Sequence, residues 1–181
     1  MKQAWLSQPV TAAANPRRFQ AVRKHLASLD GLRGVAALAV VGSHFENLSG
    51  IELHLQGKQA HWNVVGTNFR DLHLQLDEIV DIARDASDTI AERIRALNAV
   101  PDGRSDTITA STTLPAFPPA EQTTTDTVDF ITTAIYAAVH TVRTVHDDVD
   151  TADPSSADLL HNIIDDLEKA AWMLKSENRK I

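Results

Sequence analysis

The chain has 181 residues, of which 43% are apolar and 5% aromatic, and its formal net charge is -7. It has no cysteine, which excludes disulfides and thiolate metal sites and fits a reducing cytoplasm. The longest apolar run, residues 34–42, is well short of the ~20 residues that span a bilayer, so we expect a soluble protein that is not exported.

Charge is distributed unevenly along the chain. Residues 1–33 contain six basic residues and one acid, a net charge of +5, which leaves -12 for the remainder. We therefore expect a basic, flexible tail at 1–33 and an acidic domain at 34–181. Such a tail either binds a polyanion such as DNA or is a solvated arm without a partner, and the composition leaves both interpretations open.

Helical spacing of apolar residues and sparse strand signatures predict an all-α fold. A first helix is expected within 34–63, and a second runs to about Asn98 behind a cap at Thr67 or Asn68. A long connection at 99–119 holds a short helix at "SDTITAST". A third helix from Thr123 to Asp148 and a turn at 150–156 precede the fourth helix, which Ser155 or Ser156 can cap. Four long helices with one long middle connection predict an antiparallel four-helix bundle with a crossover, as in ferritin-like folds.

A polar stripe runs along the second predicted helix, opposite its apolar face. It contains His73, Asp77, Asp88 and Glu92, which lie within about 100° of arc at 100° per residue. Residues 71–93 have seven acids and two bases, and acids at i,i+4 repel each other. The stripe is either a solvated face or a face that a bound cation neutralises.

Imidazole and carboxylates together suit Fe(II), Mn(II) or Zn(II) better than Ca²⁺ or Mg²⁺. However, His73 and Glu92 are roughly 28 Å apart along one helix, so one ion cannot contact both. Two copies of the helix, antiparallel about a twofold axis, would place His73 and Asp77 of one chain opposite Asp88 and Glu92 of the other. The spacing thus predicts metal sites shared between subunits, without identifying the metal.

A longer motif includes the segment before this helix. It consists of His61, Trp62, Asn63, Gly66, Phe69, Leu72, His73, Asp77, Glu78, Asp88 and the run Ala91–Arg93. In this motif, and over residues 51–181, the chain closely resembles the ferritin-like Dps family ("DNA-binding protein from starved cells"), with actinobacterial members looking closest. The chain has no Glu-x-x-His, the paired motif of true ferritins and bacterioferritins.

The resemblance implies a ferroxidase site at a twofold interface. One subunit would supply His61, His73 and Asp77, and its partner would supply Asp88 and the bridging Glu92. Trp62 would lie beside the site, as a core aromatic or as a redox group.

The resemblance also implies a Dps-type mini-ferritin that binds two iron ions per site and oxidises Fe(II), preferably with hydrogen peroxide. Ferric iron would be stored in a homododecamer built from twofold dimers, in the cytoplasm or at the nucleoid, with Asp158 in an entry pore. One alternative is a nucleoid-compacting DNA-binding protein with secondary iron chemistry, and another is a bundle oxygenase that acts on an organic substrate. The candidate contacts to non-specific DNA are Arg17, Arg18, Arg23, Lys24, Lys175, Arg179 and Lys180.

Overall fold

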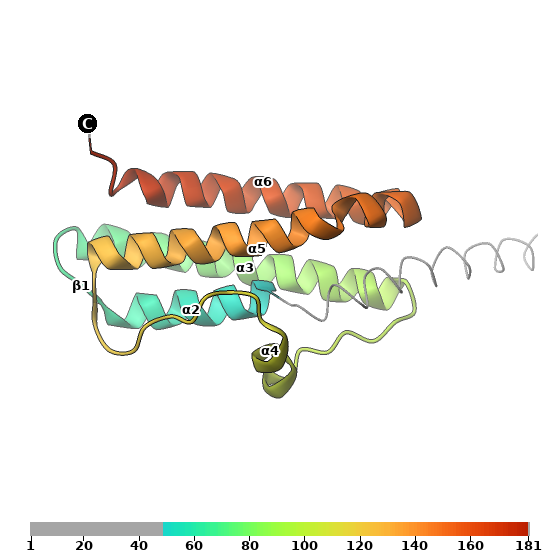
Figure 1. The fold of residues 1–181 in the computed structure, drawn as a ribbon, viewed down its shortest axis with the longest axis horizontal. Coiled ribbons are helices and arrows are strands. Elements are labelled where there is room, and N and C mark those ends of the chain that lie inside the picture. Colours follow the sequence, from blue (N-terminus) through green and yellow to red (C-terminus); the bar gives the residue numbers. More distant parts are fainter. Residues whose placement is uncertain (1–48, 181) are drawn as a thin grey trace, which may run out of the picture. The chain divides into compact units, whose positions relative to one another are not determined.

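Four long helices lie side by side in the computed structural model, which describes residues 49–180 (Figure 1). The predicted basic tail and the beginning of the predicted first helix lie outside the described residues. The long helices are α2 (Ser49–Asn63), α3 (Phe69–Ala96), α5 (Thr124–Ala152) and α6 (Pro154–Ser176). The predicted all-α fold and four-helix bundle are confirmed.

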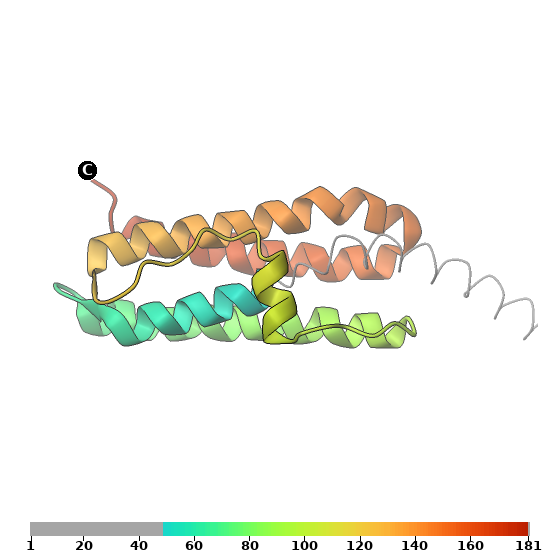
Figure 2. The ribbon, with the colours of Figure 1, turned by 60° about the horizontal axis from the view of Figure 1, so that its bottom comes forward.

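The long connection between α3 and α5 crosses the bundle and holds the short helix α4 (Ser105–Ser111), as predicted (Figure 2). Two short strands, one before α3 and one at the end of the crossover, form a small feature that periodicity did not predict. Strands β1 (Val64–Val65) and β2 (Gln122–Thr123) pair in parallel. This pairing ties the α2–α3 turn to the start of α5.

The turn between α5 and α6 is shorter than the predicted 150–156. Helix α5 continues to Ala152 and α6 begins at Pro154, so Asp153 alone separates them. Proline is tolerated at the first position of a helix because its missing N–H would have no intrahelical partner there. The predicted caps Ser155 and Ser156 lie inside α6, where the Ser156 hydroxyl donates a hydrogen bond to Asp153.

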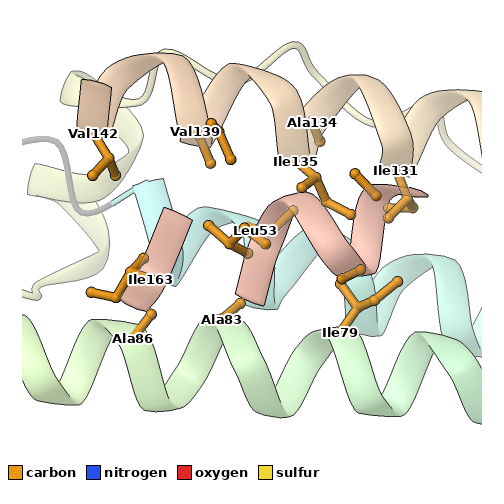
Figure 3. Close-up of a cluster of buried hydrophobic side chains, with 14 of the residues drawn as sticks. Leu53, Ile79, Ala83, Ala86, Ile131, Ala134, Ile135, Val139, Val142 and Ile163 are labelled. Carbon is orange, nitrogen blue, oxygen red and sulfur yellow. The ribbon is translucent and has the colours of Figure 1, made fainter. Parts of the chain in front are cut away.

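Apolar side chains from all four long helices meet in one core. Figure 3 shows Leu53 of α2, Ile79 of α3, Ile135 of α5 and Ile163 of α6 pointing into the same interior. Each is less than a tenth exposed. Helix α2 packs on α3 and α5, and α6 packs on α5 and α3. Within residues 49–180, no helix combines the length and apolarity that crossing a membrane requires.

Helices α2 and α3 approach each other closely at Gly57. A Cβ atom added there would lie 2.8 Å from Cγ2 of Val80, closer than packed carbon atoms tolerate. The side chain of Val80 is β-branched and stiff in a helix, so it cannot readily turn away. A residue without a side chain at position 57 therefore keeps the two helices in contact.

The burial pattern of α6 makes a stability prediction. Leu174→Ala removes a side chain that is 0% exposed and should lower the free energy of unfolding by about 2–5 kcal/mol, because a cavity remains. Met173→Ala is the matched control, since its neighbouring side chain of similar size is 43% exposed and should cost clearly less. Urea unfolding followed by circular dichroism measures both, and equal losses would contradict the packing of α6.

Candidate metal centre

The turn between α2 and α3 brings two predicted ligands into contact. Gly66 (φ 123°) and Asn68 (φ 59°) adopt left-handed backbone conformations that reverse the chain between the helices. Asn68 is the N-cap residue of α3, as predicted, although its side chain makes no capping hydrogen bond. His61, near the end of α2, consequently stacks on His73, in the second turn of α3. The ring centroids are 3.6 Å apart and the ring planes differ by 23°.

Reciprocal hydrogen bonds orient the two imidazole rings. Nδ1 of His61 lies 3.0 Å from the backbone oxygen of His73, and Nδ1 of His73 lies 3.0 Å from the backbone oxygen of His61. A carbonyl oxygen only accepts hydrogen bonds, so each ring donates from Nδ1. In the neutral form each Nε2 then carries a lone pair. This is the tautomer in which a histidine ligates a metal through Nε2 while Nδ1–H holds the ring in place.

Asp77 lies next to this histidine pair and forms an ion pair with a residue of α2. Its Oδ1 is 2.6 Å from Nζ of Lys58 and 3.3 Å from Nδ1 of His61. The hydrogen bond from Lys58 holds the pKa of Asp77 below its usual range, and nearby imidazole charge adds to the effect. The carboxylate is therefore ionised at neutral pH, with its charge balanced by an ammonium group.

Lys58 is the residue at this site that sequence reasoning missed. It precedes His61 by three positions, and residues three apart share one face of a helix. The spacing of Lys58 and His61 is the sequence feature that could have indicated Lys58 as part of the site. The pairing with Asp77, 19 positions away, depends on how α2 packs on α3.

The two predicted ligands at the other end of α3 do not reach this cluster. Asp88 and Glu92 are exposed, and neither side chain forms a hydrogen bond or ion pair within residues 49–180. From His73 to Asp88 the helix rises roughly 22 Å at 1.5 Å per residue. In the described part of the chain, no three His, Asp or Glu side chains are grouped to hold a metal ion. The chain places His61 in contact with His73 and Asp77, but these three side chains do not converge on one ion, and Asp88 and Glu92 lie apart from them.

The remaining predicted positions are at the surface or outside the described residues. Trp62 is 70% exposed, so its interpretation as a core aromatic within the chain is wrong. Asp158 is exposed in the first turns of α6. Among the basic candidates, Lys175, Arg179 and Lys180 are exposed at the end of the chain. Those outside the described residues are Arg17, Arg18, Arg23 and Lys24.

Comparisons with known proteins agree with the four-helix fold. The family model of the ferritin-like domain matches residues 49–181. The DNA protection during starvation protein of Agrobacterium fabrum is 33% identical over 143 residues, which are 78% of this chain and 88% of that protein. The solved structure of Dps from Microbacterium arborescens in the high iron form is similar with a TM-score of 0.73 and 34% sequence identity, covering 78% of this chain and 93% of that one. The chain belongs to the Dps family.

Dps relatives include an actinobacterial protein from Mycolicibacterium smegmatis, which is 30% identical over 125 residues. A differently named relative, the fine tangled pili major subunit of Haemophilus ducreyi, is 36% identical over 125 residues. The chain spans 66% of the length of that subunit and 52% of a Deinococcus radiodurans relative.

The ion pair between Lys58 and Asp77 predicts a pH effect. The depressed pKa of Asp77 stabilises the fold at pH values above the unfolded pKa, near 4, and this contribution is lost as the pH falls through the folded pKa. Lys58→Met should bring the pKa of Asp77 back toward its usual value, so the variant should lose less stability than the wild type on acidification. Thermal unfolding between pH 7 and pH 3 measures this, with Lys169→Met, at an exposed lysine of α6, as the control. An identical pH dependence in the wild type and Lys58→Met would contradict the proposed coupling.

Proposed function

We propose that this chain is an iron-storing ferroxidase that uses hydrogen peroxide and acts at sites shared between two subunits. One subunit supplies His61, His73 and Asp77, and the partner supplies Asp88 and Glu92. The single observation that carries this proposal is the placement of ligands along α3: His73 and Asp77 lie beside His61 of α2 near one end of α3, and two partnerless carboxylates lie roughly 22 Å away toward the other. A second, antiparallel copy of α3 would bring the two sets together.

The side chains are suited to binding Fe(II), which is the substrate of the proposed reaction. Two imidazole Nε2 atoms and three carboxylates offer mixed nitrogen and oxygen ligands, a set typical of iron and manganese sites. The three carboxylates would also offset three of the four positive charges of two Fe(II) ions. Glu92 would bridge the two ions, as the family resemblance implies. Lys58 would leave Asp77 when iron enters, because a dication attracts that carboxylate more strongly than one ammonium does.

The proposed oxidation requires two iron ions for each molecule of peroxide. Each Fe(II) gives up one electron, and the two electrons break the O–O bond of one hydrogen peroxide molecule. With two protons from solvent the products are two Fe(III) ions and two water molecules, so hydroxyl radical is not released. Consuming iron and peroxide together would protect DNA.

Storage of the ferric product would require a closed shell, and we propose a homododecamer built from twofold dimers. The acidic body of the protein would attract cations toward the sites and the cavity. The name of the Agrobacterium fabrum relative, DNA protection during starvation protein, and the high iron form of the Microbacterium arborescens Dps support DNA protection and iron storage as the function. The cytoplasm or nucleoid is the expected location.

Mixing two defective variants tests the shared site. His61→Ala/His73→Ala and Asp88→Ala/Glu92→Ala should each be inactive, because every site lacks part of its ligand set. In a mixed dimer one of the two sites at the interface regains all four of these ligands and the other site loses all four. Co-assembled subunits should recover ferroxidase activity at up to about half of the sites. Peroxide-dependent Fe(II) oxidation, followed by absorbance after anaerobic loading, measures this.

The matched control for that experiment is Asp81→Ala/Asp85→Ala, which removes two exposed acids of α3 that pair with Arg84. This variant should stay active without mixing. Sedimentation must show that the subunits have exchanged. If fully exchanged dimers remain as inactive as the separate variants, the shared site is refuted.

Iron entry makes a further prediction. Asp158, exposed near the start of α6, would line a pore that attracts Fe(II). Asp158→Asn should slow iron uptake several-fold without changing assembly, whereas Asp166→Asn, at an exposed acid further along α6, should not. Stopped-flow uptake kinetics measure both variants. Equal uptake rates in Asp158→Asn and the wild type would remove Asp158 from the pore.

DNA binding would be a second, electrostatic activity. Phosphate contacts need lysine or arginine, which the acidic body offers sparsely. Lys175, Arg179 and Lys180 are exposed and close together in the chain, and they could act with the basic residues of 1–33. Binding of this kind would be non-specific and would weaken steeply as the salt concentration rises.

A further inference from the structure

Two histidines outside the proposed iron site lie together on the α5–α6 hairpin. The ring centroids of His146, on α5, and His161, on α6, are 4.2 Å apart, and the ring planes differ by 37°. They lie seven residues before and eight residues after Asp153, the single residue that separates the helices. The short turn therefore places them at the same level of the antiparallel pair.

His146 has the hydrogen bonding of a histidine that ligates a metal. Its Nδ1 lies 3.2 Å from Oδ1 of Asp147, and an ionised carboxylate only accepts, so Nδ1 carries the proton. In the neutral ring Nε2 then holds a lone pair. That nitrogen is shielded from solvent and has no hydrogen-bond partner among the described residues. A carboxylate that orients Nδ1–H while Nε2 stays available is the arrangement found behind metal-binding histidines.

Ligands to complete a site are close to both histidines in the sequence. Asp150 follows His146 by four positions, and Asp165 follows His161 by four positions, which places each acid on the same helix face as its histidine. Both acids are exposed, as is His161. No three such side chains within residues 49–180 are already grouped to hold an ion, so metal binding here would require side chains to move. The exposure of His161 and of the two acids leaves room for such movement.

We propose that His146 Nε2 and the His161 imidazole bind a divalent transition metal, with Zn²⁺ as the preferred ion. An acidic side chain or water completes the coordination. Two imidazole ligands favour Zn²⁺ over the hard cations Ca²⁺ and Mg²⁺, which select oxygen ligands. The bound ion would satisfy the buried nitrogen of His146 and join α5 to α6. This site uses no ligand of the proposed iron centre.

Zinc binding to the full-length chain tests the proposal. After removal of metal with EDTA, equilibrium dialysis against Zn²⁺ should show that His161→Ala and His146→Ala each bind about one equivalent per chain less than the wild type. The matched control is His140→Ala, at an exposed histidine of α5, which should bind the wild-type amount. His161→Cys should restore binding, because thiolate is a strong zinc ligand and the chain has no other cysteine.

The experiment separates this site from the proposed iron centre. His61→Ala/His73→Ala should reduce zinc binding at that centre and leave the His146–His161 equivalent in place, so removing all four histidines should cause additive losses. Unchanged zinc binding in His161→Ala and His146→Ala would overturn the proposal. So would a loss equal to that of His140→Ala. The proposal would also be overturned if the two variants, measured in EDTA, melt at a lower temperature than the wild type but bind as much zinc. That result would assign the histidine pair a packing role.

Discussion

The close packing of α2 against α3 is the contact on which the candidate metal centre depends. Gly57 lets the two helices approach, and the left-handed residues after Val65 return the chain so that His61 meets His73. The two histidines then hold each other through backbone oxygens. Helix packing therefore sets both the position and the tautomer of the rings, and the ring nitrogens need no further partner to be oriented.

The rigidity of α3 is the second constraint. A continuous helix of 28 residues cannot bend its two ends together, so the carboxylates of Asp88 and Glu92 stay far from the histidine cluster. Within the described part of the chain, Asp77 has Lys58 as a counter-ion, whereas these two acids have none. Repulsion between unpaired acids on one helix is relieved when bound cations and a second copy of the helix face them. The proposed shared site rests on this effect.

At its far end α3 is fastened to the α5–α6 hairpin by Arg93. Its guanidinium donates hydrogen bonds to Asp153, the residue at the turn, and to Ser156. Burial alone would raise the pKa of Asp153, but hydrogen bonds from Ser156 and Arg93 outweigh it, so the pKa lies below the usual range. This partly buried ion pair lies where α5 ends and α6 begins, near the level at which His146 and His161 meet.

The sequence by itself determined the features that repeat along one helix. Apolar spacing predicted the four helices, the bundle and the short helix in the crossover, and 100° per residue placed His73, Asp77, Asp88 and Glu92 on one stripe. Tertiary structure alone decided the contacts between helices. The stacking of His61 on His73, the pairing of Lys58 with Asp77, the one-residue turn at Asp153 and the meeting of His146 with His161 join positions whose distance depends on chain reversal and packing. Periodicity carries no information about which faces of different helices touch, because many packings satisfy the same apolar pattern.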